Sequence, residues 1–88
     1  MTDNQNQNYD TMLALALDLL SQSEAQHRAA RRVETATDLL GVAIRQRRSL
    51  EAPAHALREA LRGLTDILDA QRALLAEFDR ELGEAAGT

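Results

Sequence analysis

The chain has 88 residues, of which 44% are apolar and only two are aromatic, so it has the size of one small domain. Ten Arg and no Lys stand against fourteen Asp and Glu, and the net charge of -4 excludes a strongly basic nucleic-acid binder, although a local basic patch remains open. The absence of Cys excludes disulfides, thiolate metal centres and thiol nucleophiles.

The chain begins with a polar segment. Residues 1–8 are rich in Asn and Gln and predict a disordered tail, because they contain too little apolar surface to offset the entropy of ordering. They carry no basic region typical of a secretion signal, and no run has the roughly 20 apolar residues of a membrane span. We therefore expect a cytoplasmic protein that does not insert into membranes.

Ala and Leu dominate from Asp10 onward, which predicts helix and no strand. Asp10 or Thr11 is the expected cap of a first helical region that runs to Arg48. Within it, residues 21–24 read Ser-Gln-Ser-Glu, the pattern of a capping box. This pattern leaves two alternatives: a kink that separates a short N-terminal helix, or one long helix.

The first region has a seam with alternating spacings of three and four, but its middle is small or polar. The seam comprises Met12, Ala16, Leu19, Ser23, Gln26, Ala30, Val33, Thr37, Leu40 and Ile44. Leu15 and Leu17 are expected to point away from it, so that this part of the helix is apolar nearly all round. We assign partner docking to four residues, with a third core contact in a homo-oligomer as the other alternative: Leu13, Leu15, Leu17 and Leu20.

Residues 49–53 predict a turn, because Ser49 is a candidate cap and Pro53 is tolerated in the first turn of a helix. The last helix is expected from residue 53 to residue 82, with Gly83 as its stop, so that the helical domain covers residues 9–83 and residues 84–88 fray. This helix has an unbroken heptad seam. Its members are Ala54, Leu57, Leu61, Leu64, Leu68, Gln71, Leu75, Phe78 and Leu82, and the stripe is widened on one flank by Ala60, Ile67 and Leu74.

These patterns predict an all-α antiparallel helical hairpin that assembles into a helical bundle. If the chain folds back about Glu51, residues whose numbers add up to about 102 lie opposite each other, which brings the Arg28–Arg32 stretch near Asp69 and Glu77. A lone hairpin of this length leaves its apolar stripes half exposed, so a homodimer or a partner protein is expected. The expected oligomer core is Leu57, Leu61, Leu64, Leu68, Gln71, Leu75, Phe78 and Leu82, with Gln71 fixing the register.

Glu24 and His27 have the Glu-x-x-His spacing that ferritin-like metal sites use on one helix face. Such a site needs further carboxylates, and only Glu77 or Glu81 is in antiparallel range. The alternative is a solvated pair of Glu24 and Arg28 beside a half-buried His27. No Ser/His/Asp set or phosphate-binding glycine loop can be assembled. We therefore expect no enzyme, no cofactor and no small-molecule substrate.

Residues 24–48 carry a net charge of +3, whereas residues 50–88 carry -4. A dimer would double the basic stretch, which gives a second hypothesis: a dimeric RNA- or DNA-binding hairpin. The phosphate-binding residues would be Arg28, Arg31, Arg32, Arg45, Arg47 and Arg48. The first hypothesis is a non-catalytic protein-protein interaction module, such as a small adaptor, chaperone, assembly subunit or regulatory inhibitor.

Overall fold

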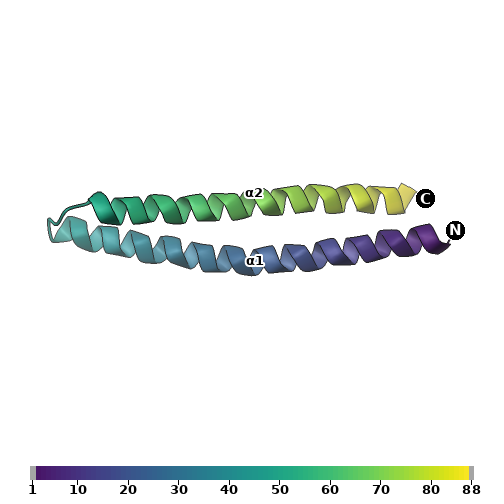
Figure 1. Ribbon diagram of the computed structural model, residues 1–88, viewed down its shortest axis with the longest axis horizontal. Helices are drawn as coiled ribbons and strands as arrows, with labels where there is room; N and C mark the ends of the chain where they lie inside the picture. Colours follow the sequence, from purple (N-terminus) through teal and green to yellow (C-terminus); the bar gives the residue numbers. More distant parts are fainter. Residues whose placement is uncertain (1, 88) are drawn as a thin grey trace.

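The computed structural model describes residues 2–87 and contains two long helices and no strand in that range, α1 (Thr2–Arg45) and α2 (Glu51–Gly87). The helices run antiparallel and lie side by side along their length, and the two chain ends lie at the same tip (Figure 1). The molecule measures 68 × 15 × 14 Å. The all-α prediction is confirmed, in the form of a long hairpin.

Helix α1 has 44 residues and begins at Thr2. Residues 2–8, for which the sequence predicts a disordered tail, form the first turns of this helix, and Met1 lies outside the described residues. Helix α1 also continues unbroken through the Ser21–Glu24 pattern, so one long helix is the observed alternative. No Gly or Pro occurs before Gly41, and nothing in the sequence therefore interrupts the backbone ladder of this helix.

Helix α1 ends at Arg45, three residues earlier than predicted, in a Schellman motif. The N–H of Arg48 donates to the carbonyl of Ala43 at 2.9 Å, and the N–H of Arg47 donates to the carbonyl of Ile44 at 3.2 Å. Arg47 has a φ of 52°, the left-handed conformation that this motif requires and that usually falls to Gly. The turn is thus closed by backbone bonds, with a residue that is strained in its conformation.

Replacing Arg47 with Gly is expected to stabilise the hairpin by about 1 kcal/mol, because Gly adopts a positive φ without the steric cost of a Cβ. Thermal or urea unfolding followed by circular dichroism would measure the gain. The matched control is Arg48→Gly, because Arg48 is equally exposed but has no positive φ. If Arg48→Gly raised the free energy of unfolding as much or more, strain at Arg47 would not be the cause.

Helix α2 begins at Glu51, where the carbonyl of Leu50 accepts the first helical bond from the N–H of Ala54 at 2.9 Å. Leu50, not Ser49, therefore occupies the N-cap position, and the turn lies at residues 46–50 and not at 49–53. Pro53 fits in the first helical turn because its missing N–H would have no partner there. The helix continues through Gly83 to Gly87, so the predicted stop at Gly83 is also wrong.

The contact seam of α1 differs from the predicted one at every second position. Met12, Leu19, Gln26, Val33 and Leu40 are partly buried, as predicted. The seam residues between them each precede the predicted residue by one position. They are Leu15, Gln22, Ala29, Ala36 and Ala43. Of the residues predicted there, Ala30 is partly covered, whereas the others are exposed: Ala16, Ser23, Thr37 and Ile44. Alanine on the observed seam allows the two backbones to approach closely, which bulkier residues would not.

The seam of α2 is shifted in the same way. It retains four of the predicted residues, Leu57, Leu64, Gln71 and Phe78, which are partly buried. The column that alternates with them is the predicted widening flank of Ala60, Ile67 and Leu74, which continues to Glu81. The residues Leu61, Leu68, Leu75 and Leu82 are exposed. Half of the predicted oligomer core therefore lies outside the contact between the two helices.

The register of the hairpin follows from its turn. Because α1 ends at Arg45 and α2 begins at Glu51, residues whose numbers add up to about 96, and not 102, lie opposite each other. Among the described residues no ion pair joins Arg28, Arg31 or Arg32 to Asp69 or Glu77, so the predicted charge match is not formed. Within the described part of the chain, each ion pair lies inside α2 and none joins the two helices.

Candidate interaction surfaces

The interior of the hairpin is thin. Among the side chains that the structure describes, four apolar ones are buried, Leu15, Ala29, Ala36 and Ala43, and no side chain is completely enclosed. Three of these four are Ala, which contribute little apolar area. Many of the larger apolar side chains consequently remain exposed. Most of these lie on two surfaces, whereas Leu39, Val42 and Leu50 lie elsewhere, near the turn.

The first surface, the outer leucine patch, consists of Leu13, Leu17 and Leu20. These residues lie on the side of α1 that faces away from α2, and each is 57 to 61% exposed. Leu15, which the sequence analysis placed with them, is only 7% exposed and lies in the seam. The prediction that Leu15 points away from the seam is wrong, because the seam passes through Leu15 and not through Ala16. The docking role of the other three residues stays a prediction.

The second surface, the leucine face, follows one edge of the hairpin. On α2 it consists of Leu61, Leu68, Leu75 and Leu82, which are 37 to 51% exposed and recur every seven residues. Each helix places two residues of every seven in the seam. The residues that directly follow the second of these two form a column along the helix, and in an antiparallel pair the columns of the two helices lie on the same edge. The column of α1 on this edge is therefore Tyr9, Ala16, Ser23, Ala30, Thr37 and Ile44.

A groove of about 320 Å³ lies beside the leucines of α2. It is lined by Leu19 of the α1 seam and by Leu68, Gln71, Arg72 and Leu75 of α2. Each predicted seam consists of two columns. One of them contacts the other helix in the structure, and the other lies on the leucine face. The heptad signal was thus correct in period and covers a wider stripe than one partner helix can bury.

The opposite edge of the hairpin carries a groove that the sequence analysis missed. Its volume is about 550 Å³, and its floor is formed by small side chains, among them Ala29, Ala36, Ala60 and Gly63. Arg31, Arg32 and Glu59 stand at its margin. The spacing of Ala56, Ala60 and Gly63 along one side of α2 was the available signal, because small residues three and four apart leave a depression on a helix surface.

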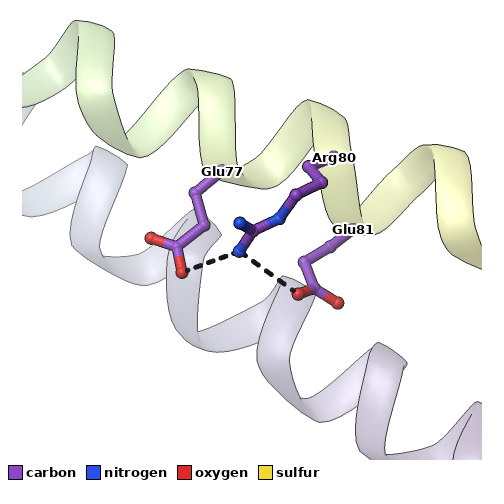
Figure 2. A network of polar contacts seen from close by, with 3 residues as sticks. All are labelled: Glu77, Arg80 and Glu81. Carbon is purple, nitrogen blue, oxygen red and sulfur yellow. Dashed lines mark hydrogen bonds and ion pairs between the residues drawn. The ribbon is translucent and has the colours of Figure 1, made fainter.

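Charged side chains are paired along α2. Arg62 binds Glu59 at 3.0 Å and Arg72 lies 4.0 Å from Asp69, as the spacing of these residues allows. Near the tip, Arg80 lies between Glu77 and Glu81, at 3.5 Å and 3.9 Å (Figure 2). Glu81 is on the seam, and its side chain is only 15% exposed. This pairing allows the seam to contain a carboxylate.

The six arginines predicted to bind phosphate are all exposed: Arg28, Arg31, Arg32, Arg45, Arg47 and Arg48. They form two groups, one near the middle of α1 and one at the turn. None of the six takes part in an ion pair with a described carboxylate, in contrast to three arginines of α2. Their guanidinium groups are therefore available to an external anion.

Glu24 and His27 lie exposed on the outer surface of α1, beside Ser23 and Arg28 around a shallow depression. His27 is thus not half-buried, and no ion pair joins Glu24 to Arg28 in the described chain. Among residues 2–87, no group of three or more His, Asp or Glu side chains is close enough to hold a metal ion. The spacing of Glu24 and His27 is therefore not matched by ligands from α2.

Neither helix of residues 2–87 is both long and apolar enough to cross a membrane. The chain matches no protein-family model, no curated protein and no solved structure.

Proposed function

We propose that this protein is a non-catalytic interaction module that lays apolar helix faces against another protein chain. The observation that carries the proposal is the exposure of large apolar side chains in ordered arrays, on the outer leucine patch and on the leucine face. Single exposed leucines are common on protein surfaces, but contiguous apolar patches mark interaction surfaces. Amphipathic helices commonly bind partners through such patches.

The outer leucine patch is the surface that we assign to a different protein. Leu13, Leu17 and Leu20 face away from α2, so the hairpin itself does not cover them. They are also spaced by four and three residues, the spacing with which one side of a helix enters the groove of a partner. An adaptor or small chaperone would hold its partner in this way without a chemical step.

A photoreactive amino acid at position 17 tests this assignment. In the cells that produce the protein, Leu17→benzoylphenylalanine is expected to yield a cross-linked product with a second, different protein, several-fold more abundant than the product from Asp38→benzoylphenylalanine. Asp38 is the matched control because it is exposed on the same outer side of α1. Equal yields at both positions, or a product at position 17 that contains only copies of this chain, would contradict docking of another protein there.

A second candidate function is supported by the unpaired arginines. Because Arg45, Arg47 and Arg48 gather at the turn without carboxylate partners, they are free to contact the phosphates of a nucleic acid. This is the dimeric RNA- or DNA-binding hairpin of the second hypothesis.

The test of this candidate is retention on a phosphate-bearing resin. The protein is expected to bind at low salt and to elute as salt rises, because phosphate contacts release counterions. The Arg45→Gln, Arg47→Gln, Arg48→Gln triple variant should pass through. The control replaces Arg62, Arg72 and Arg80, which are already paired with carboxylates, by Gln. Passage of the unchanged protein at low salt, or loss of retention in both triple variants, would reject the candidate.

A further inference from the structure

The two columns of the leucine face contain no charged residue, and Arg72 lies beside them in the groove next to Leu68 and Leu75. The α1 column contains small residues between Tyr9 and Ile44, and the α2 column contains leucines after Ala54. The opposite edge, in contrast, carries four charged residues in the equivalent columns: Asp18, Arg32, Glu77 and Glu84. An uncharged, regularly spaced apolar edge is typical of a surface that is buried in the working form of a protein.

The hairpin exposes more area than a compact monomer of its mass, as its 68 × 15 × 14 Å shape requires. The chain exposes 6738 Å², whereas a compact monomer of the same 9.7 kDa mass exposes about 5,100 Å². If the excess of about 1,600 Å² per chain were buried between two copies, the total of about 3,200 Å² would fall in the range of permanent homodimers. A second copy thus offers an interface of the required size.

The side chains of the leucine face alternate in size across the hairpin. At the register of the structure each large side chain of one helix lies level with a small side chain of the other. The large residue is on α2 in every pair but one, in which it is Ile44 of α1. The level pairs are Leu61 with Thr37, Leu68 with Ala30, Leu75 with Ser23, Leu82 with Ala16, and Ala54 with Ile44. Thr37 is compatible with burial because its hydroxyl already donates to the carbonyl of Val33, at 2.7 Å.

We propose that two copies of this chain pack through their leucine faces into a four-helix bundle in which α2 of each copy lies against α1 of the other, with both turns at the same end. A two-fold axis along the length of the bundle makes every neighbouring pair of helices antiparallel and keeps the register of the hairpin. Each leucine of α2 then meets a small residue of the second copy. With turns at opposite ends, two other packings would arise. In one, α2 lies against α2 of the other copy, so that leucines meet leucines. In the other, α2 lies parallel to α1 of the other copy.

This inference rests on the proposed function, since it names the partner of one apolar surface. The two can nevertheless fail separately. A monomeric protein that is cross-linked to another protein through position 17 would refute the bundle and keep the adaptor. A dimer that forms no cross-link to another protein through position 17 would keep the bundle and refute the adaptor.

The first experiment measures the mass of the purified protein by sedimentation equilibrium. We expect twice 9.7 kDa for the unchanged chain. The Leu68→Glu, Leu75→Glu variant is expected to dimerise at least about 100-fold more weakly, because two carboxylates would be buried without partners. Both leucines are exposed in the hairpin, so its helicity by circular dichroism should persist. The control is Leu39→Glu, since Leu39 is 56% exposed on the opposite edge.

A charge exchange tests the predicted neighbours. Leu68→Glu and Ala30→Arg variants should each dimerise more weakly than the unchanged chain. Their mixture should form a heterodimer, because the carboxylate introduced in one copy would meet the guanidinium introduced in the other. A monomeric mass for the unchanged chain overturns the proposal. So does a dimer that survives Leu68→Glu, Leu75→Glu, or one that dissociates only with Leu39→Glu.

The orientation is tested with a spin label at Ser49→Cys, an exposed position in the turn of a chain without native Cys. Turns at the same end place the two labels within about 30 Å of each other, because helices in a bundle are only about 10 Å apart. Turns at opposite ends separate the labels by nearly the 68 Å length of the molecule. A long distance measured by pulsed electron resonance would overturn the proposed arrangement.

Discussion

Replacing Ala36 with Leu is expected to destabilise the hairpin by about 1 to 3 kcal/mol, because Ala36 is buried in the seam and three additional carbons would press against α2. Ala36 is 6% exposed and lies between Ala29 and Ala43, which are buried to a similar degree. The larger side chain would force the helices apart and remove contacts along the neighbouring turns. Urea unfolding followed by circular dichroism at a fixed protein concentration would measure the loss, which is a large share of the stability of a small protein.

The matched control is Ala76→Leu, because Ala76 is exposed on the outer side of α2. Leu and Ala both have high helix propensity, so this substitution should change the free energy of unfolding by less than about 0.5 kcal/mol. If both variants lost the same stability, close approach of the helices at Ala36 would not be the cause.

Replacing Gln26 and Gln71 together with Leu is expected to stabilise the hairpin by about 2 kcal/mol, because two half-buried apolar side chains would replace two polar ones. The two residues lie opposite each other in the register of the structure and are partly buried, as is Gln22 beside them. Neither amide makes a hydrogen bond to another described residue. The polar layer therefore costs stability at the centre of the seam.

The gain should be accompanied by a loss of order, since a single polar layer in an apolar seam fixes which turns face each other. The midpoint of thermal unfolding would report the stability, and the dispersion of backbone amide signals in nuclear magnetic resonance would report the uniqueness of the register. Gln46→Leu is the control, because Gln46 is exposed in the turn. A destabilised double variant would show that the two amides hold the helices together.

The sequence was sufficient for the helical class, the antiparallel hairpin and one column of each seam. Leu19, Leu40, Leu64 and Phe78 recur with the period of a helix face and are covered by the partner helix, as predicted. The length of the helices was underestimated, because the Asn and Gln residues at the start of α1 are polar but do not break a helix. Gly83 likewise has no conformation that requires Gly.

The second column of each seam could not be chosen from the sequence. Adjacent residues such as Ala29 and Ala30, or Leu74 and Leu75, are both apolar and differ only in the side of the helix that they occupy. The leucine column of α2 completes an unbroken heptad pattern, and the sequence therefore predicts it as part of the seam. The hairpin instead uses the columns around Ala29, Ala36 and Ala43, where close backbone contact compensates for small side chains.

The shift of the seam by one residue also explains where the candidate interaction residues lie. Leu13, Leu17 and Leu20 are exposed, whereas Leu15 became a seam residue once the seam shifted by one position. The groove beside Ala60 and Gly63 escaped notice because a depression arises from the absence of side chains, which a search for apolar periodicity does not register.

The extended shape of the hairpin determines how it opens. Each turn of α1 touches only the turn beside it on α2, so the molecule can separate progressively from one end in the manner of a zipper. The tip with both chain ends contains Glu81 and lies beyond the glutamine layer, whereas the alanine contacts lie toward the covalently joined turn. Backbone amide hydrogens should consequently exchange with solvent fastest near the tip and slowest around Ala36.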